Sequence, residues 1–176
     1  EHMQFTQEGT LNKGTPVGLK DDKAYVESGW DYMHQSKYSQ AEESFKKALE
    51  INPKNDEAYF GLGCIYRDER KGFDSNFSFK KAIEINPKND KALAELGWTN
   101  RDTGDYSQAE EYLKKAIELN PEDDNVRFEF GRLYRDQGNF SKAEEFLNKA
   151  LDLNPRNDAA YLELAWVYRE QDKLIQ

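Results

Sequence analysis

The stretch NPKNDKALAELGWTNRDTGDYSQAEEYLKKAIELNP (residues 86–121) begins and ends with the same Asn-Pro pair, so that the two pairs lie 34 residues apart. This spacing recurs along the chain, and a constant period of that size is typical of stacked copies of one small unit. The four pairs are Asn52-Pro53, Asn86-Pro87, Asn120-Pro121 and Asn154-Pro155. We therefore divide the chain into units at 22–55, 56–89, 90–123 and 124–157, followed by a partial fifth unit at 158–176.

Each complete unit is predicted to contain two helices, because its apolar residues recur at spacings of three and four. In the second unit, Ala58, Leu62 and Ile65 would lie on one face of the first helix. In the third unit, Ala109 and Leu113 would do the same on the second helix. Since the residue before a proline avoids the helical region, each Asn-Pro pair is expected to end a second helix.

Local signals at the helix ends agree with this division. Serine followed three residues later by glutamate is a capping-box pattern, which predicts the start of a second helix. An aspartate shortly after each Asn-Pro pair is a predicted N-cap of the next first helix. Capping boxes are predicted at Ser39/Glu42, Ser107/Glu110 and Ser141/Glu144, N-caps at Asp56, Asp90 and Asp158, and glycine turns at Gly104 and Gly138.

Two parts of the chain depart from the pattern. Gly72-Phe73 lies one residue later than the Asp-Tyr pair of the other units, such as Asp105-Tyr106, and this predicts a locally altered turn in the second unit. Residues 1–21 are rich in glycine and threonine and show no helical period, so they are predicted to be a tail or linker. Within that segment, residues 1–3 (Glu-His-Met) read as a cloning remnant.

The residues that repeat resemble the tetratricopeptide-repeat family over roughly residues 22–172. Leu62-Gly63 and Leu96-Gly97 match the family's Leu-Gly pair, and the prolines of the Asn-Pro pairs match its proline. The family's tyrosine is matched by Tyr32, Tyr66, Tyr134 and Tyr168, whereas Arg127, Asn100 and Ser75 depart from the pattern. The resemblance implies an all-α, right-handed solenoid of antiparallel helix pairs, with four full repeats and one extra helix. It also implies a non-enzymatic scaffold for protein–protein interaction.

The resemblance further implies that the first helices line a concave groove. Groove residues then follow as the first-helix positions that point away from the Leu/Gly/Tyr face. The predicted peptide-binding residues are Trp30, Phe60, Arg67, Trp98, Arg101, Phe128, Arg132, Arg135, Trp166 and Arg169.

Two interpretations of these side chains stay open. The aromatic residues either face a ligand or pack between repeats. The arginines either contact a ligand or form a structural ladder with glutamates one unit further on. In the ladder interpretation Arg67 would reach Glu95, Arg101 would reach Glu129 and Arg135 would reach Glu163.

The composition narrows the class of partner. The net charge of −9 argues against binding a phosphate backbone or an anionic membrane, and a protein or peptide ligand is favoured instead. Cys64 is the only cysteine and no stretch has the length of a membrane span, which suits a cytoplasmic location.

The sequence offers few candidates for catalytic, metal-binding or cofactor-binding residues. His34 and Cys64 lie on the predicted first helices of adjacent units, but no third group that would orient them is evident. No cysteine and histidine set has zinc spacing, and no glycine-rich loop could hold a phosphate. We therefore expect no catalytic residue, no metal and no cofactor.

The last unit leads to the alternative functions. With no second helix after residues 158–172, Tyr161, Leu164 and Tyr168 are expected to be partly bare and are candidates for an oligomer interface. Either the natural chain continues, or the N-terminal segment or a second copy covers this face. The alternatives to a peptide-binding scaffold are therefore a self-assembling structural module and a regulatory fragment of a larger enzyme or sensor.

Overall fold

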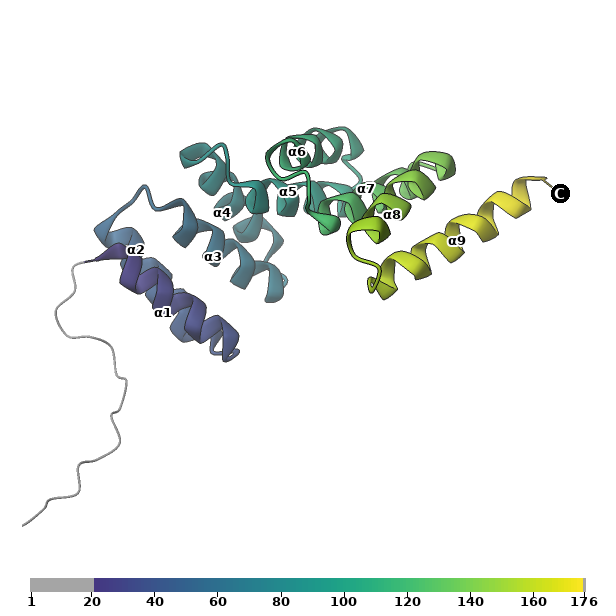
Figure 1. Cartoon of the computed structure of the whole chain (residues 1–176). Helices are drawn as coiled ribbons and strands as arrows, with labels where there is room; N and C mark the ends of the chain where they lie inside the picture. Colours follow the sequence, from purple (N-terminus) through teal and green to yellow (C-terminus); the bar gives the residue numbers. More distant parts are fainter. Residues whose placement is uncertain (1–20, 176) are drawn as a thin grey trace, which may run out of the picture.

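The fold is seen in a computed structural model that describes residues 21–175, with side chains described to residue 172. Within this range the chain forms helices and no strand, and the helix pairs follow one another in a curved row (Figure 1). The predicted tail at 1–21 lies almost wholly outside the described residues. The helices are α1 (Asp22–His34), α2 (Tyr38–Ile51), α3 (Asp56–Asp68), α4 (Gly72–Ile85), α5 (Asp90–Asp102), α6 (Tyr106–Leu119), α7 (Asp124–Asp136), α8 (Phe140–Leu153) and α9 (Asp158–Ile175).

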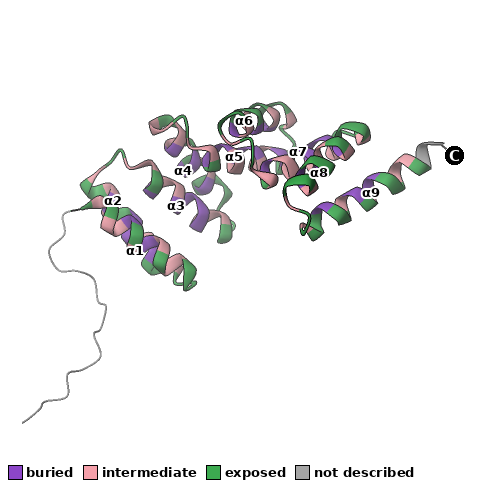
Figure 2. Ribbon diagram, viewed as in Figure 1, coloured by how far each residue is buried: buried purple, intermediate pink, exposed green. Residues whose placement is uncertain are grey.

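The packing is that of an all-α solenoid of helix pairs. Each first helix packs on the second helix of its own unit, and that second helix packs on the first helix of the next unit. The first helices also touch one another, except that α3 and α5 contact each other less than the other neighbouring pairs do. Figure 2 shows that buried residues lie on the helix faces that meet these neighbours. The fold class predicted from the sequence is confirmed.

Asparagine, not the predicted aspartate, caps most first helices. The side-chain oxygens of Asn55 and Asn89 accept hydrogen bonds from the amides of Ala58 and Ala92, at 2.8 and 3.0 Å. Asp56 instead starts the helix, where a carboxylate is favoured by the helix dipole. The N-cap predictions for Asp56, Asp90 and Asp158 are therefore wrong by one residue, since each of these is the first residue inside its helix.

The aspartate that starts each first helix holds the end of its own unit. The asparagine of the Asn-Pro pair donates its side-chain amide to this carboxylate, which ties the C-cap of the second helix to the beginning of the first helix. The hydrogen bonds join Asn52 to Asp22 at 2.7 Å, Asn86 to Asp56 at 2.8 Å, Asn120 to Asp90 at 3.1 Å and Asn154 to Asp124 at 2.9 Å. This geometry explains why asparagine recurs before proline every 34 residues.

The predicted capping boxes are also wrong, because α2, α6 and α8 begin one residue before each serine. Asp105 and Asn139 cap α6 and α8, whereas α2 has no side-chain cap. The capping-box glutamates instead bind the next unit. They accept hydrogen bonds from tyrosine hydroxyls, with Glu42 bound to Tyr66 at 2.9 Å, Glu110 to Tyr134 at 3.1 Å and Glu144 to Tyr168 at 3.1 Å.

The joint between the second and third units lacks this tyrosine–glutamate bond. Asn76 stands in the place of the glutamate and Asn100 in the place of the tyrosine. Asn100 donates to the Leu96 carbonyl at 2.7 Å, and the buried Oδ1 of Asn76 has no hydrogen-bond partner among the described residues. The two asparagines therefore do not link their units as the tyrosine–glutamate pairs do elsewhere.

The turn of the second unit is not altered, contrary to the prediction. Helix α4 starts at Gly72, in the same register as the other second helices, and Arg70 adopts a φ of 61° where Gly104 and Gly138 have 80° and 73°. Ser36 does the same with a φ of 57°. A non-glycine residue in this left-handed region costs about 1–2 kcal/mol, so the sequence places two strained residues in turns that glycine fits.

Replacing Arg70 with glycine is expected to raise the free energy of unfolding by about 0.5–1 kcal/mol. The strain at φ 61° disappears, and the greater entropy of glycine in the unfolded chain offsets part of the gain. Urea unfolding followed by circular dichroism measures the change. As a control, Gly138→Ala should lower the stability by about 1 kcal/mol. A lower midpoint for Arg70→Gly would contradict the expectation.

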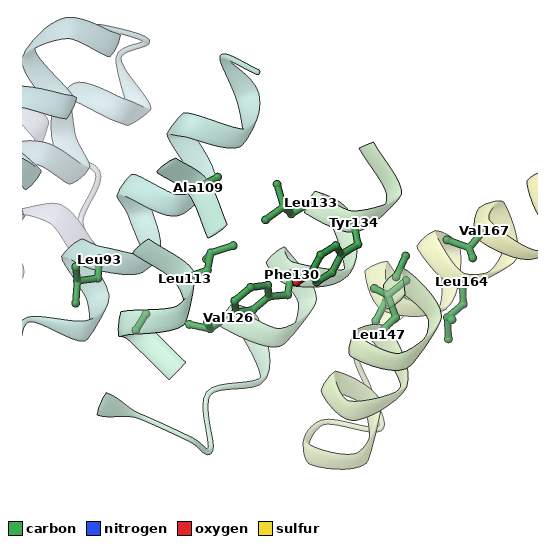
Figure 3. Packing of buried hydrophobic residues seen from close by; sticks show 13 residues of the cluster. Leu93, Ala109, Leu113, Val126, Phe130, Leu133, Tyr134, Leu147, Leu164 and Val167 are labelled. Carbon is green, nitrogen blue, oxygen red and sulfur yellow. The ribbon is translucent and has the colours of Figure 1, made fainter. Parts of the chain in front are cut away.

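The core is a row of interlocking side chains along the curve of the solenoid. Figure 3 shows the cluster that runs from Leu93 through Leu113 and Phe130 to Leu147 and Val167. Glycine on a first helix leaves room for the large residue of its second helix. At Gly131, for example, an added Cβ would lie only 2.5 Å from Cγ of Leu147.

Candidate functional site

Two adjoining depressions lie over α1, α3, α5 and α7, with volumes of about 810 and 560 Å³. They share four lining residues, so we treat them as one surface, called the groove below. The shared residues are Phe60, Arg67, Lys91 and Glu95. The larger depression also includes Trp30, His34 and Glu57, and the smaller one also includes Trp98, Asn125, Glu129 and Arg132.

Half-buried aromatic rings form one end of the groove. Trp30 lies with its ring centroid 5.9 Å from that of Phe60 and 5.3 Å from the buried Phe45, which it meets edge-on. Its indole Nε1 donates to Glu57 at 3.2 Å. Each ring thus combines packing within the solenoid with a face that lines the groove, so packing between repeats is present and contact with a ligand stays a prediction.

The arginine ladder predicted from the sequence is present. Arg67 pairs with Glu95, Arg101 with Glu129, and Arg135 with Glu163. The guanidinium groups of Arg67 and Arg135 also lie over Trp98 and Trp166, with Cζ 5.9 and 5.3 Å from the ring centroids. The ladder therefore joins successive first helices by ion pairs and by cation–π contacts.

Arg101 is the buried member of the ladder, with 4% of its surface exposed. Its three nitrogens reach Glu129 at 3.2 Å, Asp136 at 2.8 Å and Asp102 at 3.1 Å. In the next unit Arg132 occupies the position that Trp98 and Trp166 occupy in their units. Arg101 was predicted as a groove residue, but it does not face the groove because three carboxylates enclose it.

The carboxylates around Arg101 are shifted in opposite directions. Burial raises the pKa of Glu129, and Arg132 and Arg101 offset this only in part. Burial also acts to raise the pKa of Asp136, but hydrogen bonds from Arg135 and Arg101 outweigh it and hold this pKa below its usual range. Arg101 thus lowers the pKa of both carboxylates, but only for Asp136 do the arginines together outweigh burial.

The structure brings five of the ten predicted groove residues to the groove, namely Trp30, Phe60, Arg67, Trp98 and Arg132. The other five lie elsewhere. Phe128 lies beneath Arg132, with Cζ 5.7 Å from its ring, and Trp166 packs edge-on against Phe140. Arg135 is held by Glu163 and Asp136, and Arg169 is exposed on α9 beside Glu170.

Lys91 and Asn125 line the groove but were not among the predicted peptide-binding residues. Both lie one helical turn before a ladder glutamate, at the position that Glu57 occupies in the second unit. That register, counted back from the glutamate row, was the signal that could have identified them. Lys91 is exposed and has no ion pair among the described residues, so it adds an uncompensated positive charge to the groove.

Cys64 lines the groove together with His34 but is 6% exposed, and burial raises the pKa of its thiol to about 12. A nucleophilic cysteine needs the opposite shift. We therefore expect Cys64 in the folded chain to react with a disulfide reagent at pH 8 at least about 100-fold more slowly than an exposed cysteine. The same reagent added in denaturant should give the fast rate. Equal rates in both conditions would contradict the burial.

The predicted oligomer face of α9 is only partly exposed. Tyr161 and Tyr168 are exposed, at 52% and 44%, whereas Leu164 is 6% exposed and belongs to the core. Including Leu164 in that face was wrong, because the side chain packs inward with Val167. Tyr168 also donates its hydroxyl to Glu144, so its ring lies along α8.

No helix in the described part of the chain combines the length and apolar character that a membrane crossing requires. No cluster of three or more histidine, cysteine, aspartate or glutamate side chains within residues 21–172 has the arrangement of a metal site.

Three tetratricopeptide-repeat family models match the chain, over residues 23–55, over 44–74 and 78–111, and over 100–164 and 135–174. No curated protein sequence matches it. Among solved structures, it is similar to Pseudomonas aeruginosa pilF, with 26% identity over 87% of this chain and 70% of the other, at a TM-score of 0.78. It is also similar to the MamA protein, with 25% identity, coverage of 86% and 82%, and a TM-score of 0.73. The fold of YrrB, described as a TPR protein with an unusual peptide-binding site, matches at 23% identity, coverage of 87% and 79%, and a TM-score of 0.71.

Proposed function

The chain belongs to the tetratricopeptide-repeat family, and on this premise we propose that it is a non-enzymatic scaffold that captures a peptide segment of a partner protein in the groove. Proteins built from these repeats are typically interaction modules without catalytic activity. The observation that carries the proposal is the groove itself, a continuous depression over four first helices.

The residues that line the groove suit an extended peptide. Trp30, Phe60 and Trp98 offer aromatic surface, and tryptophan and arginine are enriched among residues that dominate binding energy. The ladder fixes the first helices relative to one another, so that the groove loses little conformational entropy when a peptide binds. The groove stays open to solvent along its length, which favours a chain segment over a compact small molecule.

The charges of the groove indicate what the peptide carries. Glu57 accepts from Trp30, Glu95 is paired with Arg67, and Glu129 is paired with Arg101. Lys91 is an exposed groove cation without an ion pair among the described residues, and Lys88 at the edge of the larger depression is another. Apolar side chains of the ligand would lie against Phe60 and Trp98, and Lys91 would bind a backbone carbonyl or another acceptor of the ligand.

A displayed peptide library selected on the chain tests the proposal, with the affinity of the selected peptides measured by fluorescence anisotropy. The double variant Phe60→Ala/Trp98→Ala is expected to weaken binding at least about 30-fold, since one hot-spot residue contributes about 2 kcal/mol or more. For peptides that the groove variant weakens, Phe73→Ser removes an exposed ring outside the groove and serves as the matched control, with no expected change. If both variants fold and bind the selected peptides as the wild type does, the groove is not the binding site.

Self-association through α9 is a second candidate, supported by the exposed Tyr161, Leu162 and Tyr168. Gel filtration with light scattering over about a hundredfold range of concentration tests it, because a weak dimer appears only as the concentration rises. A constant monomer mass would remove this candidate and leave the groove proposal untouched.

A further inference from the structure

The outward faces of three second helices repeat the same residues. Helices α2, α6 and α8 each carry a serine at their second position and a glutamate four residues later, and this glutamate pairs with a lysine one turn further on. The serines are Ser39, Ser107 and Ser141, and the pairs are Glu43–Lys47, Glu111–Lys115 and Glu145–Lys149, each at 2.6 Å. Such a face is polar and well solvated.

Helix α4 replaces both residues by phenylalanine. Phe73 stands in the place of the serine and Phe77 in the place of the glutamate, and they are 84% and 53% exposed. Phe73 is the most exposed of the large apolar residues in the described range. Because residues four apart lie on the same side of a helix, the two rings form one apolar ridge on α4, here called the phenylalanine ridge.

The ridge has no partner within the described chain beyond one lysine. Lys81 is equivalent to Lys47 but has Phe77 in the place of its glutamate partner. Its Nζ lies 6.0 Å from the centroid of the Phe77 ring and pairs with Glu84 at 2.7 Å. Gly72, at the start of α4, leaves open space where other second helices begin with tyrosine or phenylalanine. The groove is lined by first helices, so the ridge is a separate surface.

The charges around the ridge differ from those of the other second helices. Helices α2, α6 and α8 each have three acidic residues and two lysines, whereas α4 has two of each. Arg70 and Lys80 are exposed beside the two ends of the ridge, and neither has an ion pair among the described residues. Near these two cations, Asp74 is the one exposed acidic residue of the described chain that has no ion pair.

We propose that the phenylalanine ridge docks an amphipathic segment of a partner protein that presents large apolar side chains flanked by acidic residues. The apolar side chains would cover Phe73 and Phe77, and the flanking carboxylates would meet Arg70 and Lys80. The net charge of −9 repels an acidic partner at long range. In physiological salt this repulsion is screened over about 8 Å, so at contact the attraction to Arg70 and Lys80 outweighs it. Two neighbouring exposed rings where three equivalent helices are polar mark an interaction surface.

The test uses a displayed library of helix-forming peptides about 20 residues long, selected on the chain, with affinities measured by fluorescence anisotropy. The key variant, Phe73→Ser/Phe77→Glu, restores the residues of the other second helices and is therefore compatible with the fold. Peptides that bind the ridge should lose at least about 10-fold in affinity to this variant. Lys80→Glu should also weaken the acidic peptides, and their binding should fall with added salt.

The groove variant Phe60→Ala/Trp98→Ala is the control that separates the two surfaces, because it should leave ridge-binding peptides unaffected. Circular dichroism and thermal unfolding verify that every variant is folded, and the single change Phe73→Ser gives a milder test at a fully solvated position. The proposal is overturned if no selected peptide distinguishes the wild type from Phe73→Ser/Phe77→Glu. Selected peptides that are predominantly basic would overturn it too.

Sedimentation velocity of the chain alone completes the test. The proposal expects the wild type and Phe73→Ser/Phe77→Glu to sediment alike. If the wild type associates with itself and this variant does not, a second copy covers the ridge, and the proposed acidic partner is wrong.

Discussion

Replacing Arg101 with methionine is expected to lower the free energy of unfolding at pH 7 by about 3–5 kcal/mol, the loss typical of removing one partner from a buried ion pair. Arg101 is 4% exposed and binds the half-buried Glu129 and Asp136. These carboxylates keep Arg132 and Arg135 as their other partners, so the loss is expected at the lower end of this range. Methionine fills much of the same space, so the loss reports the charge and not a cavity.

The loss should depend on pH in a definite direction. Without Arg101, the folded-state pKa values of Glu129 and Asp136 both rise, because the charged forms lose a stabilising neighbour. The variant then binds protons more readily than the wild type when folded. The loss of unfolding free energy relative to the wild type is therefore largest at neutral pH. It decreases as the pH falls toward about 4, where the carboxyl groups become neutral.

Urea unfolding of both proteins at pH 7 and at a pH near 4.5 measures this effect. Arg169→Met is the matched control, because Arg169 is an exposed arginine on the same register of α9 and pairs with Glu170. That control should change the stability by less than about 1 kcal/mol. A loss at Arg101 that is equally small, or that grows on acidification, would contradict the account of the buried ladder.

Replacing Phe45 with alanine is expected to lower the free energy of unfolding by about 3–5 kcal/mol, as for other buried phenylalanines. Phe45 on α2 is completely buried, and its ring fills a slot between two glycines. An added Cβ at Gly29 would lie 2.6 Å from the ring, and one at Gly61 would lie 2.3 Å from it. One side chain thus holds α1 and α3 together, and its loss should affect both units.

Glycine interrupts the glutamate row at residue 61, where an added Cβ would lie 2.3 Å from the Phe45 ring. The second unit has Phe79 in the place of Phe45 and is followed by Glu95, whereas the third and fourth units have a leucine there, such as Leu113, and are followed by a ladder glutamate, such as Glu129. Gly61→Glu alone should therefore be strongly destabilising, since it drives a carboxylate against Phe45. Met33 stands where the ladder has arginine, so position 61 also lacks a cation.

Combining Met33→Arg, Phe45→Leu and Gly61→Glu reproduces the combination found at the last two joints, as in Arg101, Leu113 and Glu129. This triple variant is expected to recover at least half of the stability that Gly61→Glu loses, as measured by urea unfolding. No recovery would show that the slot and the ladder are not coupled at this joint. Circular dichroism of each variant verifies that its helix content is unchanged before the midpoints are compared.

The groove was predictable from the sequence only in outline. The 34-residue period gave the register of the first helices, and from it the reach of Arg67 to Glu95 and of Arg135 to Glu163. The same register treats Arg67 and Arg101 as equivalent, yet one lines the groove and the other is buried. Arg67 lies over Trp98, whereas the position equivalent to Trp98 in the next unit holds Arg132 and Arg101 is bound by three carboxylates.

At the helix ends, too, some features were predictable from the sequence and others only from the stacked units. The turn glycines were predicted because a positive φ has a local cost that the residue type reveals, as at Gly104 and Gly138. The partners of the capping-box glutamates were not predictable locally. Glu42 and Glu110 bind tyrosines 24 residues further along the chain, and these reach them only after the units have stacked.

The sequence by itself therefore determined the repeat, the pairing of helices within each unit and the residues available for the ladder, because these depend on periodic spacing and on backbone preferences. The tertiary structure alone decided which arginine is buried, which rings line the groove and which are left on the outside of α4. Exposure is the property that separates these cases, and it depends on the side chains that adjacent units bring against each position.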